Sequence, residues 1–177
     1  GPKQFEEALF RAKKLDLAPK VVFLVHLAGQ CADLEALYKI AFREEINVIE
    51  DAAHAIGTKY TDSHNQIFTV GCCEHSTMTV FSFHPAKTIA MGEGGAITTN
   101  DPELANKLRL LRSHGITKSR DDFIGDTFGQ DENTLNGPWY YEMQSLGFNY
   151  RASDINCALG ASQLKKLEKF KEHRQKA

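Results

Sequence analysis

The fold of this chain can be predicted from VVFLVHLAGQCADLEALYKIAFREEINVIED, residues 21–51. The stretch opens with a continuous apolar run at residues 21–27, which is typical of a strand buried on both faces in a parallel sheet. Asp33 can then cap a helix with a regular apolar stripe, and residues 46–50 form a second short strand. Strand, helix and strand at this spacing indicate a right-handed βαβ unit.

Further helices and strands are expected on both sides of this unit. Residues 5–17 have the period of an amphipathic helix. Residues 77–82 are rich in β-forming side chains, and a glycine-rich turn leads from them into residues 96–99. Residues 119–138 are polar and rich in glycine and aspartate, which predicts a long mobile loop. Residues 153–173 predict one long helix whose buried face comprises Ile155, Leu159, Leu164 and Leu167.

The composition is that of one globular domain with a sizeable core, since 42% of the 177 residues are hydrophobic. The formal net charge of -2 argues against nucleic acid or an anionic membrane as the main partner. No apolar run approaches the ~20 residues that span a bilayer, and the N-terminus lacks the pattern of a secretory signal. We therefore expect a cytoplasmic protein.

The cysteines predict reduced thiols rather than a metal site. Adjacent Cys72 and Cys73, followed by His75, suggest metal ligands at first sight. However, neighbouring side chains in extended backbone point to opposite faces, and no second ligand pair with zinc spacing is present. We expect that no metal is bound and that the thiols are free, as is usual in the cytosol.

Three polar residues lie at or beyond the ends of predicted strands, where ligands bind in open α/β sheets. They are Asp51, Ser82 and Lys87. Singly, each has an ordinary explanation as a helix cap, a turn residue or a surface charge. Together they meet the needs of pyridoxal phosphate, which requires a lysine amine for a Schiff base, a carboxylate to keep its pyridine nitrogen protonated and donors for its phosphate. The glycine-rich turn at residues 92–95 would permit close backbone approach to a flat cofactor.

Several motifs in register make this interpretation specific. From about residue 21 to residue 167, the chain resembles the DegT/DnrJ/StrS sugar aminotransferases, which are fold-type I pyridoxal-phosphate enzymes. The resemblance implies an α/β fold of three layers, α/β/α, with a mostly parallel sheet. The matching motifs are GQ (29–30), EDAAHA (50–55), FSFHPAK (81–87), GEGGAITTND (92–101), RSHG (112–115) and LGFNYR (146–151).

The resemblance implies a role for each cofactor-binding residue. Lys87 forms the Schiff base and, once displaced by the substrate amine, moves the proton between cofactor and substrate carbons. Asp51 pairs with the pyridinium nitrogen, His54 lies near the ring hydroxyl, and Ser82 binds the phosphate. Asn149 reaches the phosphate of the neighbouring subunit's cofactor, so the resemblance also implies a homodimer.

Substrate contacts are expected from His84, Glu93 and Tyr150, although His84 could equally be a packed turn residue. Residues 138–144, PWYYEMQ, resemble the branch that aminates C4 of a UDP-linked 4-keto-6-deoxy-N-acetylhexosamine on the way to pseudaminic acid. The alternative is an aromatic loop packed on the domain surface. The resemblance implies transfer of an amino group, with glutamate as the expected donor, in pseudaminic acid or related surface-glycan biosynthesis.

Family members are roughly twice as long as this chain. Residues 1–177 are therefore expected to be the central part of the pyridoxal-phosphate-binding large domain, without its N-terminal segment and the small C-terminal domain, and to be weak or inactive alone. Two other hypotheses stay open. Relatives include sugar dehydratases that lack the lysine, against which Lys87 argues, and the chain could be a non-catalytic binding or regulatory domain that retains the fold.

Overall fold

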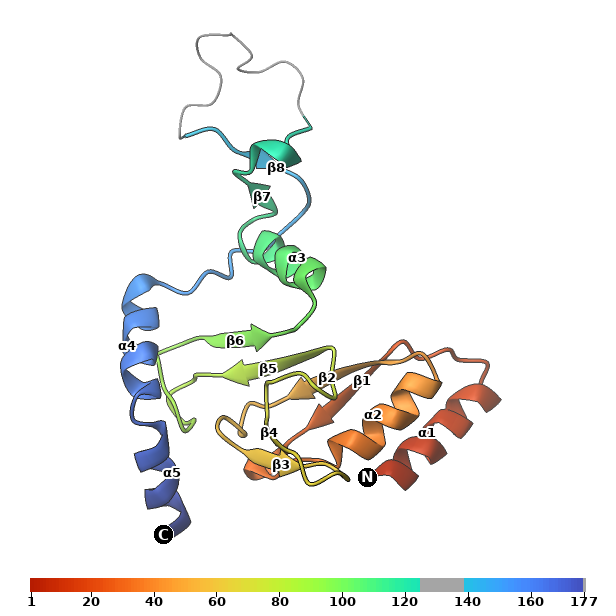
Figure 1. Cartoon of the computed structure of the whole chain (residues 1–177). Helices are drawn as coiled ribbons and strands as arrows, with labels where there is room; N and C mark the ends of the chain where they lie inside the picture. Colours follow the sequence, from red (N-terminus) through yellow and green to blue (C-terminus); the bar gives the residue numbers. More distant parts are fainter. Residues whose placement is uncertain (125–138, 177) are drawn as a thin grey trace. The chain divides into compact units, whose positions relative to one another are not determined.

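The computed structural model describes residues 1–124 and 139–176 (Figure 1). The chain divides into two compact units. The first comprises Gly1–Asp101 and Ala152–Ala177, and the second comprises Pro102–Arg151.

A four-stranded sheet is the centre of the first unit. Its strands are β1 (Val21–Val25), β2 (Asn47–Asp51), β5 (Met78–Ser82) and β6 (Gly95–Thr98), in the order β1-β2-β5-β6. The first three are mutually parallel, and β6 runs antiparallel to β5. The predicted α/β class with a mostly parallel sheet is therefore confirmed, as is the βαβ unit.

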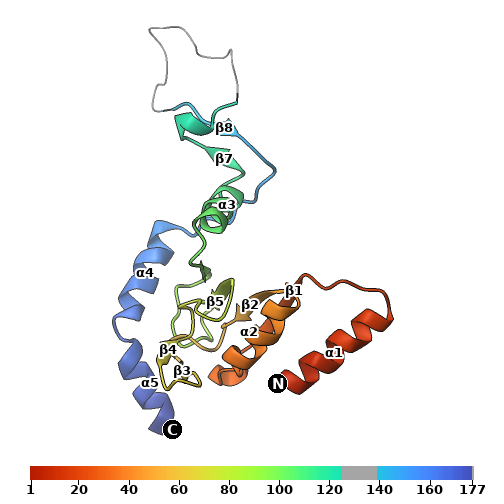
Figure 2. The same ribbon diagram turned by 45° about the vertical axis from the view of Figure 1, so that its right-hand side comes forward.

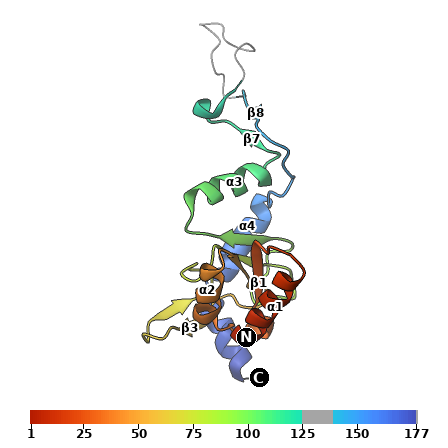
Figure 3. The same cartoon turned by 90° about the vertical axis from the view of Figure 1, so that its right-hand side faces the viewer.

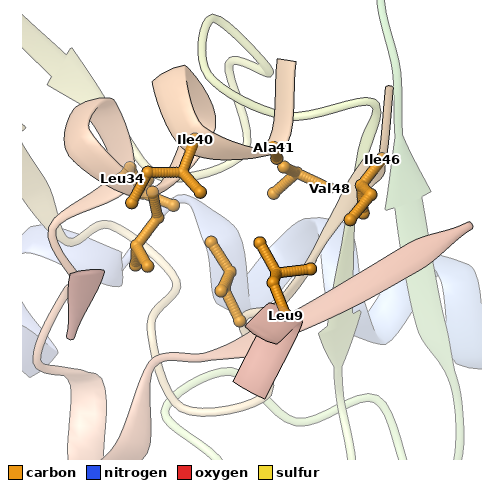
Figure 4. Close-up of a cluster of buried hydrophobic side chains, with 8 residues drawn as sticks. Leu9, Leu34, Ile40, Ala41, Ile46 and Val48 are labelled. Atoms are coloured by element: carbon orange, nitrogen blue, oxygen red, sulfur yellow. The ribbon is translucent and has the colours of Figure 1, made fainter. Parts of the chain in front are cut away.

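Two helices, α1 (Pro2–Lys14) and α2 (Leu34–Arg43), lie side by side on one face of this sheet (Figure 2). The Asp33 side chain accepts a hydrogen bond from the Ala36 amide and caps α2, as predicted. The apolar stripes of both helices meet the sheet in one buried cluster (Figure 4). Its buried members are Leu9, Leu24, Leu34, Leu37, Ile40, Ala41, Ile46 and Val48.

The opposite face of β1 is less covered than the sequence predicts. Leu24 points into the helix-covered core and is 8% exposed, whereas Phe23 is 65% exposed. Val21 and Val25 are exposed on the same side as Phe23, because side chains alternate along a strand. The expectation that residues 21–27 are buried on both faces is therefore wrong for Val21, Phe23 and Val25.

A short hairpin between β2 and β5 is not anticipated by the sequence pattern. Its strands, β3 (Lys59–Thr61) and β4 (Ile67–Thr69), are antiparallel, and the hairpin lies beside α2 (Figure 3). The Ser63 hydroxyl and amide both donate to the Glu35 carboxylate at 2.7 Å. Hydrogen bonds from Lys39 and Ser63 lower the pKa of Glu35 to about 2.

The predicted long C-terminal helix is two helices, α4 (Asp154–Leu164) and α5 (Leu167–Lys176). The face expected to be buried is largely exposed, since Ile155 is 82% exposed. Gly160 is instead the buried residue of α4. Apolar spacing identified the helix, but it could not tell which residues have a packing partner.

The second unit contains α3 (Pro102–Arg112), a short 3-10 helix (Arg120–Asp122), and a two-stranded ribbon of β7 (Ile116–Thr117) and β8 (Glu142–Met143). Residues 125–138 of the predicted mobile loop lie outside the described residues, so that prediction is not tested.

Candidate functional site

Asp51 and Ser82 lie at the same edge and on the same face of the sheet. They end the neighbouring parallel strands β2 and β5. Asp51 is in register with Val80, and Ser82 lies two residues further along β5, about 7 Å toward the carboxyl edge. Because side chains alternate along a strand, Val80 and Ser82 lie on the same face of the sheet, and Asp51 lies on that face too. Helices α1 and α2 cover the opposite face. The Asp51 Oδ1 atom accepts a hydrogen bond from the Ala53 amide at 3.1 Å, which restrains the half-buried carboxylate.

Lys87 lies in the loop that connects β5 to β6 and leaves the same edge of the sheet. The Phe83 backbone closes this loop, donating to the Gly94 carbonyl and accepting from the Met91 amide. Ile89 and Met91 are buried and anchor the loop in the core. The Lys87 side chain is half-buried.

Helix α4 supports this lysine loop, which Figure 1 shows reaching the helix. The Asn156 side chain donates to the Glu93 carbonyl oxygen at 3.0 Å. A Cβ atom at Gly160 would lie only 3.2 Å from the Met91 Cβ atom, so a small residue allows α4 to pack closely against the loop. Neither Asn156 nor Gly160 has a role that the sequence pattern predicts.

His84 and Glu93, the two predicted substrate residues of this loop, are near each other. The His84 Nε2 and Glu93 Oε1 atoms are 4.0 Å apart, and both side chains are exposed. The His84 Nδ1 atom accepts a hydrogen bond from the Ala86 amide, and the His84 carbonyl accepts one from the Lys87 amide. His84 therefore shapes the turn that carries Lys87, and its contact with substrate stays a prediction.

His54 follows Asp51 and contacts the turn after β1. The Ala28 amide donates to the His54 Nδ1 atom at 3.3 Å, and the Thr58 hydroxyl donates to the Gly29 carbonyl at 3.0 Å. Gly29 has a φ of 83°, and a Cβ atom there would lie 2.9 Å from the His54 carbonyl oxygen. Only glycine fits this close approach without strain.

A buried polar network lies beneath the site, and the sequence pattern does not predict a role for its members. Glu50, which is 2% exposed, accepts hydrogen bonds from His26 Nε2 at 2.9 Å, Ser76 Oγ at 2.5 Å and Thr79 Oγ1 at 2.6 Å. Burial raises the pKa of Glu50, but these three hydrogen bonds together lower it below its ordinary value. A carboxylate within the short buried strand NVIED was the available signal.

Asn149 and Tyr150 belong to the second unit. Asn149 pairs with Ser113 in an isolated antiparallel bridge, and the Tyr150 ring stacks on Phe148 with centroids 4.8 Å apart. Their roles at the cofactor and the substrate stay predictions.

All four cysteines are free thiols. Cys73 is buried and donates to the Thr98 carbonyl, while the His75 Nδ1 atom contacts the Tyr60 hydroxyl at 2.9 Å. Among residues 1–124 and 139–176, no three His, Cys, Asp or Glu side chains are grouped to hold a metal ion. Within the same residues, no helix has the length and apolar character needed to cross a membrane.

Solved aminotransferases share this fold. The chain is 32% identical to a DegT DnrJ EryC1 StrS aminotransferase from Brucella abortus, with a TM-score of 0.72, over 96% of this chain and 39% of that one. It is 33% identical to Helicobacter pylori PseC, an aminotransferase involved in the biosynthesis of pseudoaminic acid, with a TM-score of 0.66, over 84% of this chain and 34% of that one. Residues 2–177 match the model of the DegT/DnrJ/EryC1/StrS aminotransferase family, and the chain belongs to that family.

Curated relatives agree with this assignment. The spore coat polysaccharide biosynthesis protein SpsC of Bacillus subtilis is 38% identical over 88% of this chain and 36% of its own length. The UDP-4-amino-4,6-dideoxy-N-acetyl-beta-L-altrosamine transaminase of Campylobacter jejuni is 37% identical over 87% of this chain and 35% of its own length. The chain thus spans little more than a third of the length of these relatives.

Pyridoxal phosphate is the cofactor of this family. A putative sugar aminotransferase from Streptococcus pneumoniae, 24% identical to this chain, has the same fold and is known in PLP and PMP forms. The residues of the first unit fit the same group, since a carboxylate and a hydroxyl share one face of the sheet edge and an amine lies in the adjoining loop.

Proposed function

We propose that this chain carries the cofactor-binding part of a pyridoxal-phosphate-dependent sugar-nucleotide aminotransferase. The observation that carries the proposal is the shared edge and face of Asp51 and Ser82, with the Lys87 loop starting at that edge. The substrate is proposed to be a UDP-linked 4-keto-6-deoxy sugar, as the name of the Campylobacter jejuni relative suggests. Glutamate is the proposed amino donor.

Each side chain has one proposed task. When bound, pyridoxal phosphate supplies an electron sink and a temporary carrier for the amino group. Lys87 holds the cofactor covalently and, once released from it, moves a proton at the substrate carbon. The Asp51 carboxylate keeps a proton on the ring nitrogen, the Ser82 hydroxyl donates to the phosphate, and His54 contacts the ring hydroxyl.

The remaining assignments concern the whole protein. We propose that residues 1–177 correspond to the central part of the large domain, because the chain covers about a third of its relatives. The chain alone would then be weakly active or inactive. Asn149 would reach the cofactor phosphate of a second subunit in a cytoplasmic homodimer, and His84, Glu93 and Tyr150 would contact the substrate.

Cofactor attachment tests the proposal directly. Pyridoxal phosphate is added to the chain, the adduct is reduced with borohydride, and the modified lysine is located by peptide mass spectrometry. We expect modification at Lys87, and its loss in Lys87→Ala. Lys20→Ala is the matched control, since Lys20 is an exposed lysine that precedes β1. Equal labelling of Lys87→Ala and Lys20→Ala would refute the proposal.

Substrate class needs a separate measurement. Glutamate and a panel of nucleotide-linked keto sugars are supplied, and amino-sugar formation is followed. Transfer to a UDP-linked 4-keto-6-deoxy sugar is expected to exceed transfer to other keto sugars. Elimination of a sugar hydroxyl without amine transfer would favour the dehydratase alternative, against which labelling at Lys87 argues.

A further inference from the structure

The hydrogen-bond partners of His26 determine which ring nitrogen carries its proton. The Ala32 amide can only donate, and it points at the His26 Nδ1 atom at 3.1 Å. His26 Nδ1 must therefore be an unprotonated acceptor. The proton lies on Nε2, which donates to the Glu50 carboxylate at 2.9 Å. His26 is 0% exposed, so water cannot substitute for either partner.

The backbone around His26 connects this buried pair to the turn that contacts His54. The His26 amide donates to the Asp51 carbonyl at 3.0 Å, and the His26 carbonyl accepts from the Gly29 amide at 3.1 Å. With the ring tied to Ala32, His26 thus holds both ends of residues 26–32. This turn includes Ala28, whose φ of 56° is unfavourable for a residue other than glycine. Such a conformation persists only when its surroundings hold it.

Ala28, the residue with this unfavourable φ, also holds the His54 ring in place. The Ala28 amide donates to His54 Nδ1, so a neutral His54 must carry its proton on Nε2. We propose that the buried His26–Glu50 pair is a positioning device, which holds residues 26–32 against His54 so that this exposed ring presents its Nε2–H group as a hydrogen-bond donor. Such a donor suits an anionic oxygen. That this oxygen belongs to the cofactor ring rests on the proposed function.

Substitution of Glu50 by glutamine tests the coupling. In Glu50→Gln, the amide oxygen can still accept from Ser76 and Thr79, but its NH₂ group faces the His26 Nε2–H group. Moving the His26 proton to Nδ1 relieves that conflict and creates another with the Ala32 amide. We expect the turn to loosen and His54 to lose its preference for the Nε2–H tautomer. The readout is the pair of ring-nitrogen NMR resonances of His26 and His54 in the cofactor-free chain.

Two further variants separate coupling from general damage. Thr79→Val removes one hydrogen bond to Glu50 but retains that from His26, so the His54 tautomer should stay as in the unsubstituted chain. Gly29→Ala should push the turn away from His54, because the new Cβ atom would meet the His54 carbonyl. It leaves the buried His26–Glu50 pair intact. It should change the His54 resonances only, and it remains informative if Glu50→Gln does not fold.

The inference is overturned if folded Glu50→Gln retains the His54 tautomer, if Thr79→Val changes it equally, or if Gly29→Ala leaves it unchanged. Lys87 labelling is independent of this measurement. An absence of labelling at Lys87 would refute the proposed function. The comparison of His54 tautomers would still decide whether His26 and Glu50 position His54.

Discussion

Replacement of Glu50 by alanine should be among the most destabilising polar substitutions in the first unit. It removes the shared acceptor of His26, Ser76 and Thr79, all of which are buried. The Thr79 hydroxyl has the Cys73 sulfur at 3.5 Å as another partner, whereas the other two donors lose their acceptor. Each unpaired buried donor costs about 1–3 kcal/mol, so the loss of the acceptor for these two donors in Glu50→Ala should lower the free energy of unfolding by about 2–6 kcal/mol.

The Glu50→Gln substitution gives the matched comparison. Because it keeps an acceptor for both hydroxyl groups and disturbs only the contact with His26, its expected cost is about 1–3 kcal/mol. Glu44→Gln is the surface control, since the half-buried Glu44 pairs with the exposed Lys13, and its effect should be small.

Urea titrations followed by the NMR signals of β2 amides would measure these costs. A local probe is used because the single tryptophan, Trp139, belongs to the second unit, whereas Glu50 belongs to the first. The reasoning is refuted if Glu50→Ala costs less than about 1 kcal/mol, or no more than Glu50→Gln.

Two further predictions concern pKa shifts. Because the pKa of Glu50 is lowered from 4.5, its ionised form stabilises the fold above about pH 4.5, and this contribution is lost as the pH falls through the folded-state pKa. Acid titrations of unfolding free energy should be steeper for the unsubstituted chain than for Glu50→Gln, and parallel curves would contradict this. Burial, with Glu50 and Asp33 nearby, raises the pKa of the Cys31 thiol from 9.0 to about 12. At pH 8 this pKa leaves about 1000-fold less thiolate than a pKa of 9.0 would, so iodoacetamide should modify Cys31 far more slowly than an exposed thiol. The exposed Cys72 is the internal control, and equal rates for the two cysteines, measured by mass spectrometry, would contradict the prediction.

The βαβ unit was predictable because its signals are local. An apolar strand, an aspartate cap and a helical stripe each depend on residues close in sequence. The β3–β4 hairpin was missed because its strands have only three residues each, too few to show a period. The C-terminal region was predicted as helix, but its break between α4 and α5 and the exposure of Ile155 were not.

The candidate site divides in the same way. Asp51, Ser82 and Lys87 could be selected from sequence because each lies at or beyond the end of a β-rich run and their residue types match one cofactor. His26 and Asn156 could not, because their roles depend on partners 24 and 63 residues distant along the chain. Pairing over such separations leaves no periodic signal in a single sequence.

By itself, the sequence determined the α/β class, the parallel strands β1, β2 and β5, and the residue types offered at their carboxyl ends. Only the tertiary structure decided three features: the register that places Asp51 and Ser82 on one face, the exposure of Phe23, and the hydrogen bonds that three donors make to Glu50. The physical reason is that propensity and period act along the chain, whereas register, burial and hydrogen-bond partners are set by segments that meet only after folding.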